Sequence, residues 1–468
     1  MTAAAPAPGI SENVIASARS LNRTDGDGSV PSAPAPEPHD PGSVASRTAL
    51  VVDRASDRTE WFAEFYRDLH RNPELSFEEV RTAGRLAEVL RSSGFDVTEG
   101  IGRTGVVGIL RNGDGPTVLL RGDMDALPVT EATGLSYASV ARGVTPDGED
   151  VGVMHACGHD MHVAVLAAAA EALAGSLDIW SGTLMVVGQP AEELIAGAAA
   201  MLDDGIYERF GTPDVVLGHH VGGAPAGTVT HAPGAIMSAT TKIDITIHGR
   251  GGHGSAPYHS IDPVTTAAHV ITRLQTFVAR EIDPAAPVVV TVGRVWAGTK
   301  ANVIPDDALL QLSVRATNSE VLLQATERIE RIAVAECEAT GCEEPPTVAI
   351  VMAARETVND EAVHDAVSAA HREVFGTANV WRQQSILMGS EDFGAFGGYH
   401  GGWTEQLIPT HFWFLGGMSR EAWGADANET TTPPDSLPAG HSSTFAPVLA
   451  ETLVTGRASL ISAALVYL

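Results

Sequence analysis

The nine residues from Met154 to His162, "MHACGHDMH", contain three histidines, one cysteine and one aspartate. Imidazole, thiolate and carboxylate groups are the side chains that bind transition metals in proteins. The stretch lies between an apolar segment, "VGVM", and an alanine-rich segment, "HVAVLAAAAEALAG", which are typical of a strand and a helix. The spacing of Cys157 and His159 therefore indicates a metal site at the end of a strand. A histidine-rich loop without a function is the alternative.

Further potential ligands follow other apolar segments along the chain. Asp123 and Asp125 follow "TVLLRG", Glu192 and Glu193 follow "LMVVGQPA", His219 and His220 follow "VVLG", and His441 lies in the loop "PAGHSS". Open α/β sheets bind their ligands at the carboxyl ends of the strands, so these side chains are expected at one sheet edge. A single histidine among the 17 of this chain would mean little. Five segments with the same placement indicate a metal site.

The types of ligand favour Zn²⁺, because Mg²⁺ and Ca²⁺ prefer all-oxygen shells, while cobalt or manganese could substitute. The pair Glu192 and Glu193 suits two tasks: one carboxylate can bind a metal while its neighbour takes a proton from water activated by that metal. Two solvated acids at a helix start are the alternative. Asp160 is expected to be the N-cap of a helix from Met161, which would place Cys157 near the positive end of the helix dipole.

Composition limits the class of protein. The 468 residues are too many for one core and predict two domains, or one domain with a large insertion. A formal net charge of −29 argues against nucleic acid or an anionic membrane as a partner. The three cysteines form no disulfide framework, and the chain shows neither a secretory signal nor an apolar run long enough to span a membrane. A cytoplasmic location is the expectation.

The pattern along the chain predicts an α/β fold with an inserted domain. Residues 1–56 are rich in alanine and proline and are expected to be a disordered arm. Strands alternate with helices over residues 57–237 and again over 355–468, which predicts one α/β domain with a mostly parallel sheet. Residues 238–354 follow the order βαββαβ, which predicts an inserted ferredoxin-like domain.

The inserted domain contains "GRGGHG", which matches the dinucleotide fingerprint G-x-G-x-x-G. That fingerprint has to open a helix directly after a strand. Here the loop "SAPYHSIDP" follows, and a helix is expected only from about Pro263. The motif is therefore not interpreted as a nucleotide site.

Eight motifs occur in a fixed order: "RGDMDALP", "HACGHD", "QPAEE", "GHHV", "GGHGSAP", "NVIPD", "GSEDF" and "PAGHSSTFAP". In this order the chain resembles the dinuclear metallo-amidohydrolases and metallopeptidases related to aminoacylase and carboxypeptidase G. It is most similar to the branch of hippurate hydrolases and indole-acetyl-amino-acid hydrolases, in which a cysteine replaces a bridging aspartate. The resemblance covers roughly residues 60–465.

The resemblance implies two divalent metal ions, and it implies these ligands: Cys157, His159, Glu193, His220 and His441. It makes Glu192 the general base and Asp125 a residue that orients a metal ligand from behind. His220 rather than His219 is implied, because it directly precedes the valine of the motif. The family's usual asparagine before the last histidine is Gly440 here, which leaves the ligand itself intact.

The resemblance also implies roles for residues of the inserted domain, which would act as a lid and as a dimerisation domain. His253 would be catalytic, reaching the metal site of a partner subunit in a homodimer. Asn302 and Arg315 would touch the carboxylate end of the substrate, although Arg315 could equally be an exposed strand residue.

The implied function is the hydrolysis of N-acyl-amino acids by a cytoplasmic enzyme with two divalent ions, Zn²⁺ in the first place and Mn²⁺ or Co²⁺ as substitutes. A di- or tripeptidase or a carboxypeptidase with the same machinery is the alternative enzyme. A protein that binds a metal or a ligand without catalysis is a third alternative, against which the intact Glu192 counts.

Overall fold

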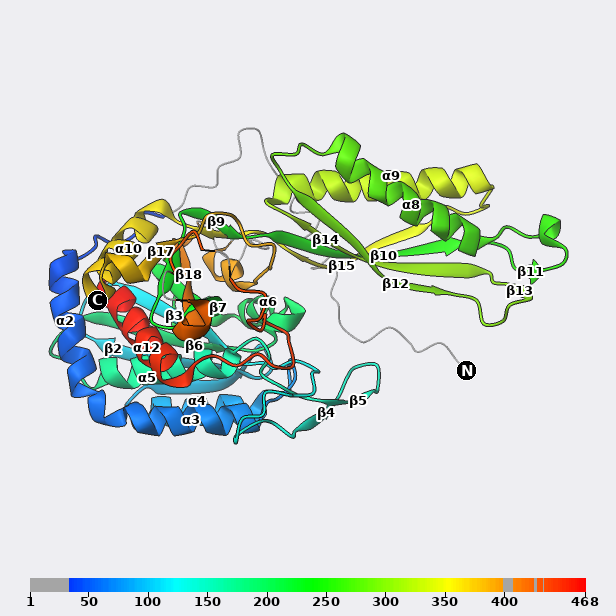
Figure 1. The fold of residues 1–468 in the computed structure, drawn as a ribbon. Helices are drawn as coiled ribbons and strands as arrows, with labels where there is room; N and C mark the ends of the chain where they lie inside the picture. The colour runs from blue at the N-terminus through cyan, green and yellow to red at the C-terminus, as the bar shows by residue number, and fades with distance from the viewer. Residues whose placement is uncertain (1–32, 399–406, 425–426, 432) are drawn as a thin grey trace. The chain divides into compact units, whose positions relative to one another are not determined.

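The computed structural model describes residues 33–398, 407–424, 427–431 and 433–468 (Figure 1). The chain divides into two compact units, which are called the main unit and the inserted unit. The main unit comprises the described residues of 33–236, Val358–Ser385 and Asp392–Leu468. Among the described residues, the inserted unit comprises Met237–Thr357 and Ile386–Glu391.

The main unit is built on an eight-stranded sheet with the order β1-β2-β6-β3-β7-β18-β8-β17. Its strands are β1 (Asp96–Ile101), β2 (Gly105–Asn112), β3 (Thr117–Asp123), β6 (Gly182–Gln189), β7 (Val215–Pro225), β8 (Val229–His231), β17 (Val380–Arg382) and β18 (Thr410–Met418). The four central strands β6, β3, β7 and β18 run parallel, and antiparallel pairs flank them. Every residue of β18 is buried, as expected of a strand covered on both faces. The predicted mostly parallel α/β sheet is confirmed.

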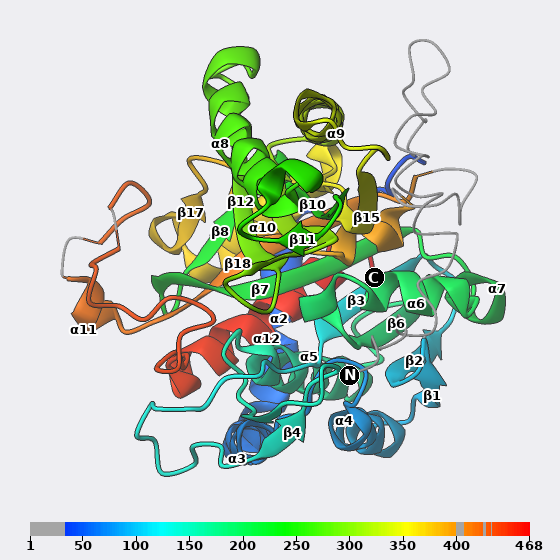
Figure 2. The same ribbon diagram turned by 90° about the vertical axis from the view of Figure 1, so that its right-hand side faces the viewer.

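Helices pack on the sheet of the main unit (Figure 2). They are α2 (Pro41–Arg54), α3 (Thr59–Arg71), α4 (Val80–Ser92), α5 (His159–Ala174), α6 (Gly197–Asp203), α7 (Ile206–Phe210), α10 (Glu361–Phe375), α11 (Arg420–Trp423) and α12 (Leu449–Leu465). The apolar helix α5 packs against β3, β6 and β7 and is enclosed by α3, α4 and α12. It is buried almost all round, which explains its lack of a polar face. Among the described helices, none has both the length and the apolar character needed to cross a membrane.

The prediction that residues 1–56 are disordered is wrong for the segment that forms α2. Asp40 caps this helix by accepting a hydrogen bond from the backbone N–H of Ser43 at 3.1 Å. Val44, Thr48 and Val51 share one buried face, which packs against α10 and α12. The alanine- and proline-rich residues before it concealed this short amphipathic pattern. Residues 1–32 of the predicted arm lie outside the described residues.

The inserted unit has the predicted order βαββαβ. Its elements are β10 (Ala239–His248), α8 (Pro263–Glu281), β12 (Val288–Ala297), β14 (Asp307–Ala316), α9 (Ser319–Thr340) and β15 (Thr347–Ala354). The antiparallel sheet has the order β12-β14-β10-β15, which is the ferredoxin-like arrangement. Both helices pack on the same face (Figure 1), and β12 forms one edge. The helix α8 starts at Pro263, as predicted, with Asp262 as its cap.

Short strands complete the structure. β4 (Arg142–Val144) pairs with β5 (Asp150–Gly152), and β9 (Gly234–Met237) pairs with β16 (Thr357–Asn359). In the inserted unit, β11 (Gly252–His253) pairs with β13 (Val303–Ile304) and forms a small two-stranded ribbon.

Candidate metal centre

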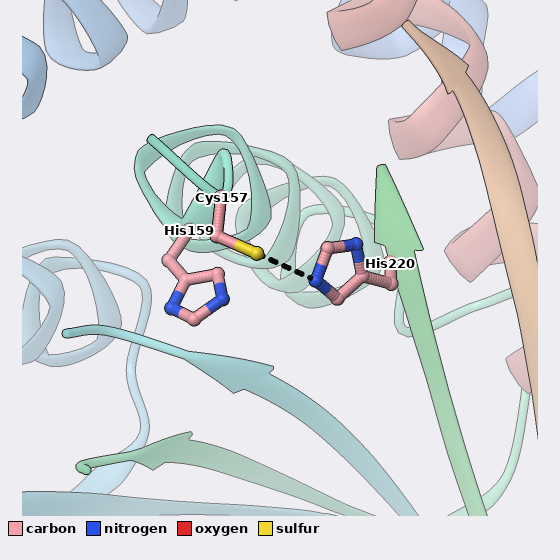
Figure 3. Close-up of side chains that lie close together, drawn as sticks. All are labelled: Cys157, His159 and His220. Atoms are coloured by element: carbon pink, nitrogen blue, oxygen red, sulfur yellow. Dashed lines mark hydrogen bonds between the residues drawn. The ribbon is translucent and has the colours of Figure 1, made fainter. Parts of the chain in front are cut away.

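The five predicted ligands gather in the main unit around the N-terminus of α5 and the adjacent parts of β6 and β7. Cys157 Sγ lies 3.4 Å from His220 Nε2 (Figure 3). It also lies 3.2 Å from His441 Nε2. Glu193 Oε1 lies 3.4 Å from His441 Nε2 and 3.9 Å from His159 Nε2. The general-base candidate, Glu192, is also present, because its Oε2 lies 3.9 Å from His159 Nε2.

The chemistry of this group fits divalent metal ions. Cys157, His159 and His220 each offer one ligand atom, and these atoms lie within 4.8 Å of one another. The same holds for Cys157 with Glu193 and His441. His159 Nε2 is buried without a hydrogen-bond partner in the described part of the chain, and it faces carboxylates. One thiol, three imidazoles and one carboxylate form a donor set typical of zinc and related metals.

The charges of the centre lead to the same conclusion. Burial would raise the pKa of the Cys157 thiol, but the charge of His220 and hydrogen bonds from neighbouring imidazoles hold this pKa well below its usual range. Burial and the nearby Cys157 raise the pKa of Glu193 to about 7. A thiolate and a carboxylate thus compete for the positive charge of the same imidazoles. A divalent cation would supply that charge, and the thiolate is the form of cysteine that binds a metal.

Asp125 forms hydrogen bonds with three residues of the site, His159, Glu192 and Glu193. Its Oδ1 lies 3.2 Å from His159 Nδ1, so the ring can donate a proton there and present the lone pair of Nε2. The same carboxylate accepts hydrogen bonds from the backbone N–H groups of Glu192 at 3.1 Å and Glu193 at 3.0 Å. Ser76 Oγ donates a further hydrogen bond at 2.6 Å. One buried carboxylate therefore orients the His159 ring and also fixes the backbone of both glutamates.

The turn that carries the two glutamates is held by a residue that the sequence analysis missed. Ala191 adopts the left-handed conformation, with φ at 48°, which costs a non-glycine residue about 1–3 kcal/mol. Glu79 Oε1 accepts a hydrogen bond from the backbone N–H of Ala191 at 2.9 Å. Burial raises the pKa of Glu79 to about 7. Only the fold reveals this contact, because Glu79 and Ala191 are 112 positions apart.

Side chains alternate between the two faces of a strand, so the neighbouring residues His219 and His220 of β7 point in opposite directions. His220 Nδ1 donates to the carbonyl of Val221 at 2.7 Å, which leaves Nε2 directed at Cys157. His219 is fully buried, and its ring stacks on Trp413 with 5.8 Å between the centroids. Burial holds the pKa of His219 well below its usual value. The structure thus places the His220 ring, and not the His219 ring, beside Cys157.

The prediction that Asp160 is an N-cap is wrong. The helix α5 begins at His159, and its N-cap is Gly158 in the left-handed conformation, with φ at 84°. Asp160 lies in the first turn, where its Oδ2 is 2.6 Å from His70 Nδ1. The other ring nitrogen of His70 lies 3.1 Å from Glu131 Oε1. The Asp160 carboxylate therefore pairs with the buried His70 and does not cap the helix.

We expect the His70→Gln variant to be less stable by about 3–5 kcal/mol at pH 7, because it leaves two buried carboxylates without a cation. Burial lowers the pKa of His70, but hydrogen bonds to Asp160 and Glu131 outweigh it and raise the pKa to about 10. A raised pKa means that the stabilisation is complete below about pH 6.5 and is lost as the pH rises through 10. The difference between parent and variant should shrink over this range.

Urea unfolding of the metal-free proteins at several pH values measures this difference. The matched control is His269→Gln, because the His269 side chain is 58% exposed and lies 4.0 Å from Glu336. The control should change stability by less than about 0.5 kcal/mol. Equal losses in both variants would contradict the assignment of charge to His70.

Two of the predicted residues belong to the inserted unit, where they lie beside each other. In the ribbon of β11 and β13, His253 pairs with Val303, and the carbonyl of Asn302 accepts a hydrogen bond from Gly254 at 2.9 Å. His253 is exposed, and its Nδ1 accepts hydrogen bonds from the backbone N–H of Ser255 at 3.1 Å and from the Ser255 hydroxyl at 2.7 Å. The ring proton is therefore on Nε2, which makes His253 a hydrogen-bond donor.

The glycines of "GRGGHG" are explained by close packing of the backbone. A Cβ atom on Gly251 would lie 2.7 Å from the carbonyl oxygen of Ile304. A Cβ atom on Gly252 would lie 2.2 Å from the hydroxyl of Ser260. The interpretation of Arg315 as an exposed strand residue is wrong, because it is half-buried and donates to the carbonyl of Met388 at 2.8 Å.

A mostly parallel α/β sheet with these thiol, imidazole and carboxylate groups together is typical of a metal-dependent hydrolase, and comparison with known proteins agrees. Residues 119–445 match the model of peptidase family M20/M25/M40. The chain is 39% identical to hippurate hydrolase of Campylobacter jejuni, over 72% of this chain and 84% of that protein. It is 36% identical to thermostable carboxypeptidase 2 of Saccharolobus solfataricus, over 76% of this chain and 86% of that protein.

Among solved structures, the chain resembles a dinuclear metal binding peptidase from the M20 family of Bacillus subtilis. The TM-score is 0.67 and the identity 27%, and the alignment covers 88% of this chain and 99% of that one. The chain therefore belongs to peptidase family M20/M25/M40, and it is a hydrolase that acts on amide bonds. The resemblance inferred from the eight motifs is confirmed.

Proposed function

We propose that this protein hydrolyses the amide bond of N-acyl-amino acids with two divalent metal ions, of which Zn²⁺ suits the ligands best. The proposed ligands are Cys157, His159, Glu193, His220 and His441, and the proposed general base is Glu192. The main supporting observation is that the Cys157 thiol lies within 3.4 Å of the His220 and His441 imidazoles. The buried Glu192 carboxylate lies 3.9 Å from the third imidazole, that of His159. The similarity to a hippurate hydrolase supports an N-acyl-amino acid as the substrate.

Two divalent cations held there would lower the pKa of water and polarise a carbonyl group. Glu192 would take a proton from the attacking water and deliver it to the leaving amine. Asp125 would keep Glu192 in place through the backbone hydrogen bond of 3.1 Å. His253, with its proton on Nε2, would donate a hydrogen bond to the carbonyl oxygen as negative charge develops. Asn302, which directly precedes β13 of the ribbon, would bind the carboxylate of the substrate.

We also propose a homodimer that forms through the inserted unit, in which each His253 serves the metal centre of the partner. The strand β12 lies at the edge of its sheet, and an unpaired edge is a template for pairing with a second copy. Apolar side chains on this strand are exposed: Val289 by 44%, Val295 by 53% and Trp296 by 60%. The cytoplasm is the proposed location, because a thiol ligand has to remain reduced.

Activity should depend on both the metal and the thiol. We expect the purified, metal-loaded protein to hydrolyse members of an N-acyl-amino acid panel, to lose this activity with a chelator or a thiol oxidant, and to recover it with Zn²⁺ plus a reductant. The control is Cys342→Ser, which removes a half-buried thiol of the inserted unit and should keep both sensitivities. Full activity in a sample shown to be free of metal would refute the proposed function.

A carboxypeptidase is the second candidate, supported by the 36% identity to a thermostable carboxypeptidase. The same panel separates the two, because a carboxypeptidase would prefer peptides to N-acyl-amino acids at equal concentration. A protein that only binds would turn over neither class while still taking up metal. The buried Glu192 beside the ligands counts against that third possibility.

A further inference from the structure

Four other histidines form a buried cluster in the main unit that uses none of the proposed metal ligands. His231 ends β8, His411 is the second residue of β18, and His364 and His371 lie two turns apart on α10. The helix α10 packs against β8, β17 and β18 at this side of the sheet. All four side chains are buried, with exposed fractions between 0% and 8%. We call them the histidine cluster.

The hydrogen bonds of the cluster determine where the ring protons lie. His371 Nε2 is 3.0 Å from the carbonyl oxygen of Ser459, which can only accept, so this nitrogen carries the proton. In a neutral ring His371 Nδ1 then accepts, and His231 Nε2, which is 2.9 Å away, donates. His231 Nδ1 is consequently a lone pair, and it lies 3.0 Å from His411 Nε2.

The neutral state follows from the surroundings of the cluster. Burial lowers the pKa of each of the four histidines, and it lowers that of His371 to about 4. Two acids and two arginines also act on His364: Asp365 and Glu361 raise its pKa, while Arg372 and Arg382 lower it. An added proton on the cluster is therefore a poor way to satisfy its lone pairs.

Two ring nitrogens of the cluster have no hydrogen-bond partner within the described residues. They are His364 Nδ1 and His411 Nδ1, and both are buried. Buried polar atoms nearly always have a partner, so these two nitrogens call for an explanation. The rings of His231, His364 and His411 lie close together, with centroid distances of 5.2, 5.4 and 6.1 Å.

One possible ligand atom from each of these three histidines lies within 4.8 Å of the others. For His411 this atom is Nε2, which lies 3.0 Å from His231 Nδ1, so His411 would bind a metal in the tautomer that carries its proton on Nδ1. Zinc binds imidazole nitrogen at about 2.0–2.1 Å, which places tetrahedral ligands about 3.4 Å apart. The ion would replace the His231–His411 hydrogen bond of 3.0 Å, and the two rings would turn to direct their nitrogens at it. His231 already donates its other ring proton to His371, and metal-bound histidines usually make such an outer hydrogen bond.

We propose that His231, His364 and His411 form a separate binding site for a zinc-type transition metal ion, with His371 orienting His231. Three neutral imidazoles suit Zn²⁺, Cu²⁺ or Ni²⁺, and the fourth position remains for solvent. Because the ligands come from α10 and from two strands, the ion links this helix to the sheet. The site is structural, and it does not depend on the proposed catalytic function.

The test uses the full chain and zinc itself. In a Cys157→Ser/Glu193→Gln background, which disables the candidate metal centre, the stripped protein should still bind one Zn²⁺ per chain, as measured by elemental analysis and titration calorimetry. Adding His364→Ala should remove this zinc, whereas adding His269→Ala should not. The parent protein should hold one Zn²⁺ per chain more than its own His364→Ala variant.

Thermal unfolding provides a second readout, because an ion that binds only the folded state raises the unfolding temperature. Zinc should raise the Tm of the background protein and should leave that of the added His364→Ala variant unchanged. His364 is the least buried member of the cluster, and circular dichroism checks that its replacement leaves the fold intact. A background protein without zinc, or zinc content that survives His364→Ala, would overturn the proposal. If the proposed catalytic centre is wrong and the histidine site is right, the parent and background proteins will each bind one Zn²⁺ per chain, at the histidine site.

Discussion

The Glu192→Gln variant should bind as much metal as the parent protein and turn over about 10²–10⁴-fold more slowly, which is the typical contribution of a general base. Glutamine has nearly the same size and keeps the backbone hydrogen bond to Asp125, so the turn that carries Glu193 should not move. An amide cannot take a proton from water at neutral pH, and the acceptor of the reaction is lost. Values of kcat, together with elemental analysis of the same samples, test this expectation.

The neighbouring Glu193→Ala variant is the comparison that gives this result its meaning. Glu193 Oε1 lies within 3.9 Å of both His159 and His441, so its loss should lower the metal content as well as the turnover. If metal analysis gave the opposite pattern, the roles of the two glutamates would be exchanged. Normal turnover in both variants would rule out a carboxylate base in this turn.

The sequence predicts those parts of the candidate site that depend on short spacing in the chain or on the arrangement of the strands. Cys157 and His159 are two positions apart at the start of a helix, and the strand ends of a parallel sheet meet at one edge, so their gathering follows from the fold class. The alternation of side chains along a strand separates His219 from His220, but the sequence does not show which of the two faces the site. The packing of His219 on Trp413 settles it.

Other parts could not be predicted because their partners are distant in the chain. Glu79 holds Ala191 from 112 positions away, and nothing near either residue indicates the contact. Asp160 has the sequence position of a helix cap, yet the buried His70, 90 positions earlier, takes its carboxylate. The helix α2 was missed for a different reason. Its apolar face is short, and it is stabilised by packing against α10 and α12 rather than by its own composition.

The histidine cluster also could not be predicted from the sequence. Its members are spread between residues 231 and 411 and follow no ligand spacing in the chain. Only the pairing of β8 with β18 and the packing of α10 bring them together. A local motif reveals a site whose residues lie in one segment, whereas the buried nitrogens of this cluster come together only in the folded chain.

The His253→Ala variant should keep its metal and lose about 10²–10³-fold in turnover, the typical cost of one lost donor to a developing oxyanion. The Ser255 N–H holds His253 Nδ1 as an acceptor, so Nε2 carries the donated proton. His259→Ala is the matched control, because His259 is exposed in the same unit and should be dispensable. A variant that lost metal and activity together would instead indicate a general disturbance of the fold.

Mixing two inactive variants decides which subunit each His253 serves. The His253→Ala and Glu192→Gln proteins, combined under conditions of demonstrated subunit exchange, form heterodimers in which one subunit has an intact Glu192 and the other an intact His253. If His253 acts across the dimer, one of the two sites in each heterodimer is complete, and random exchange of equal amounts should restore up to about a quarter of the parent activity. If His253 acts within its own subunit, every site in the mixture lacks one of the two groups. Exchange without recovery would therefore place His253 in the site of its own chain or outside catalysis, and the proposed role of the inserted unit as a bridge between subunits would fall with it.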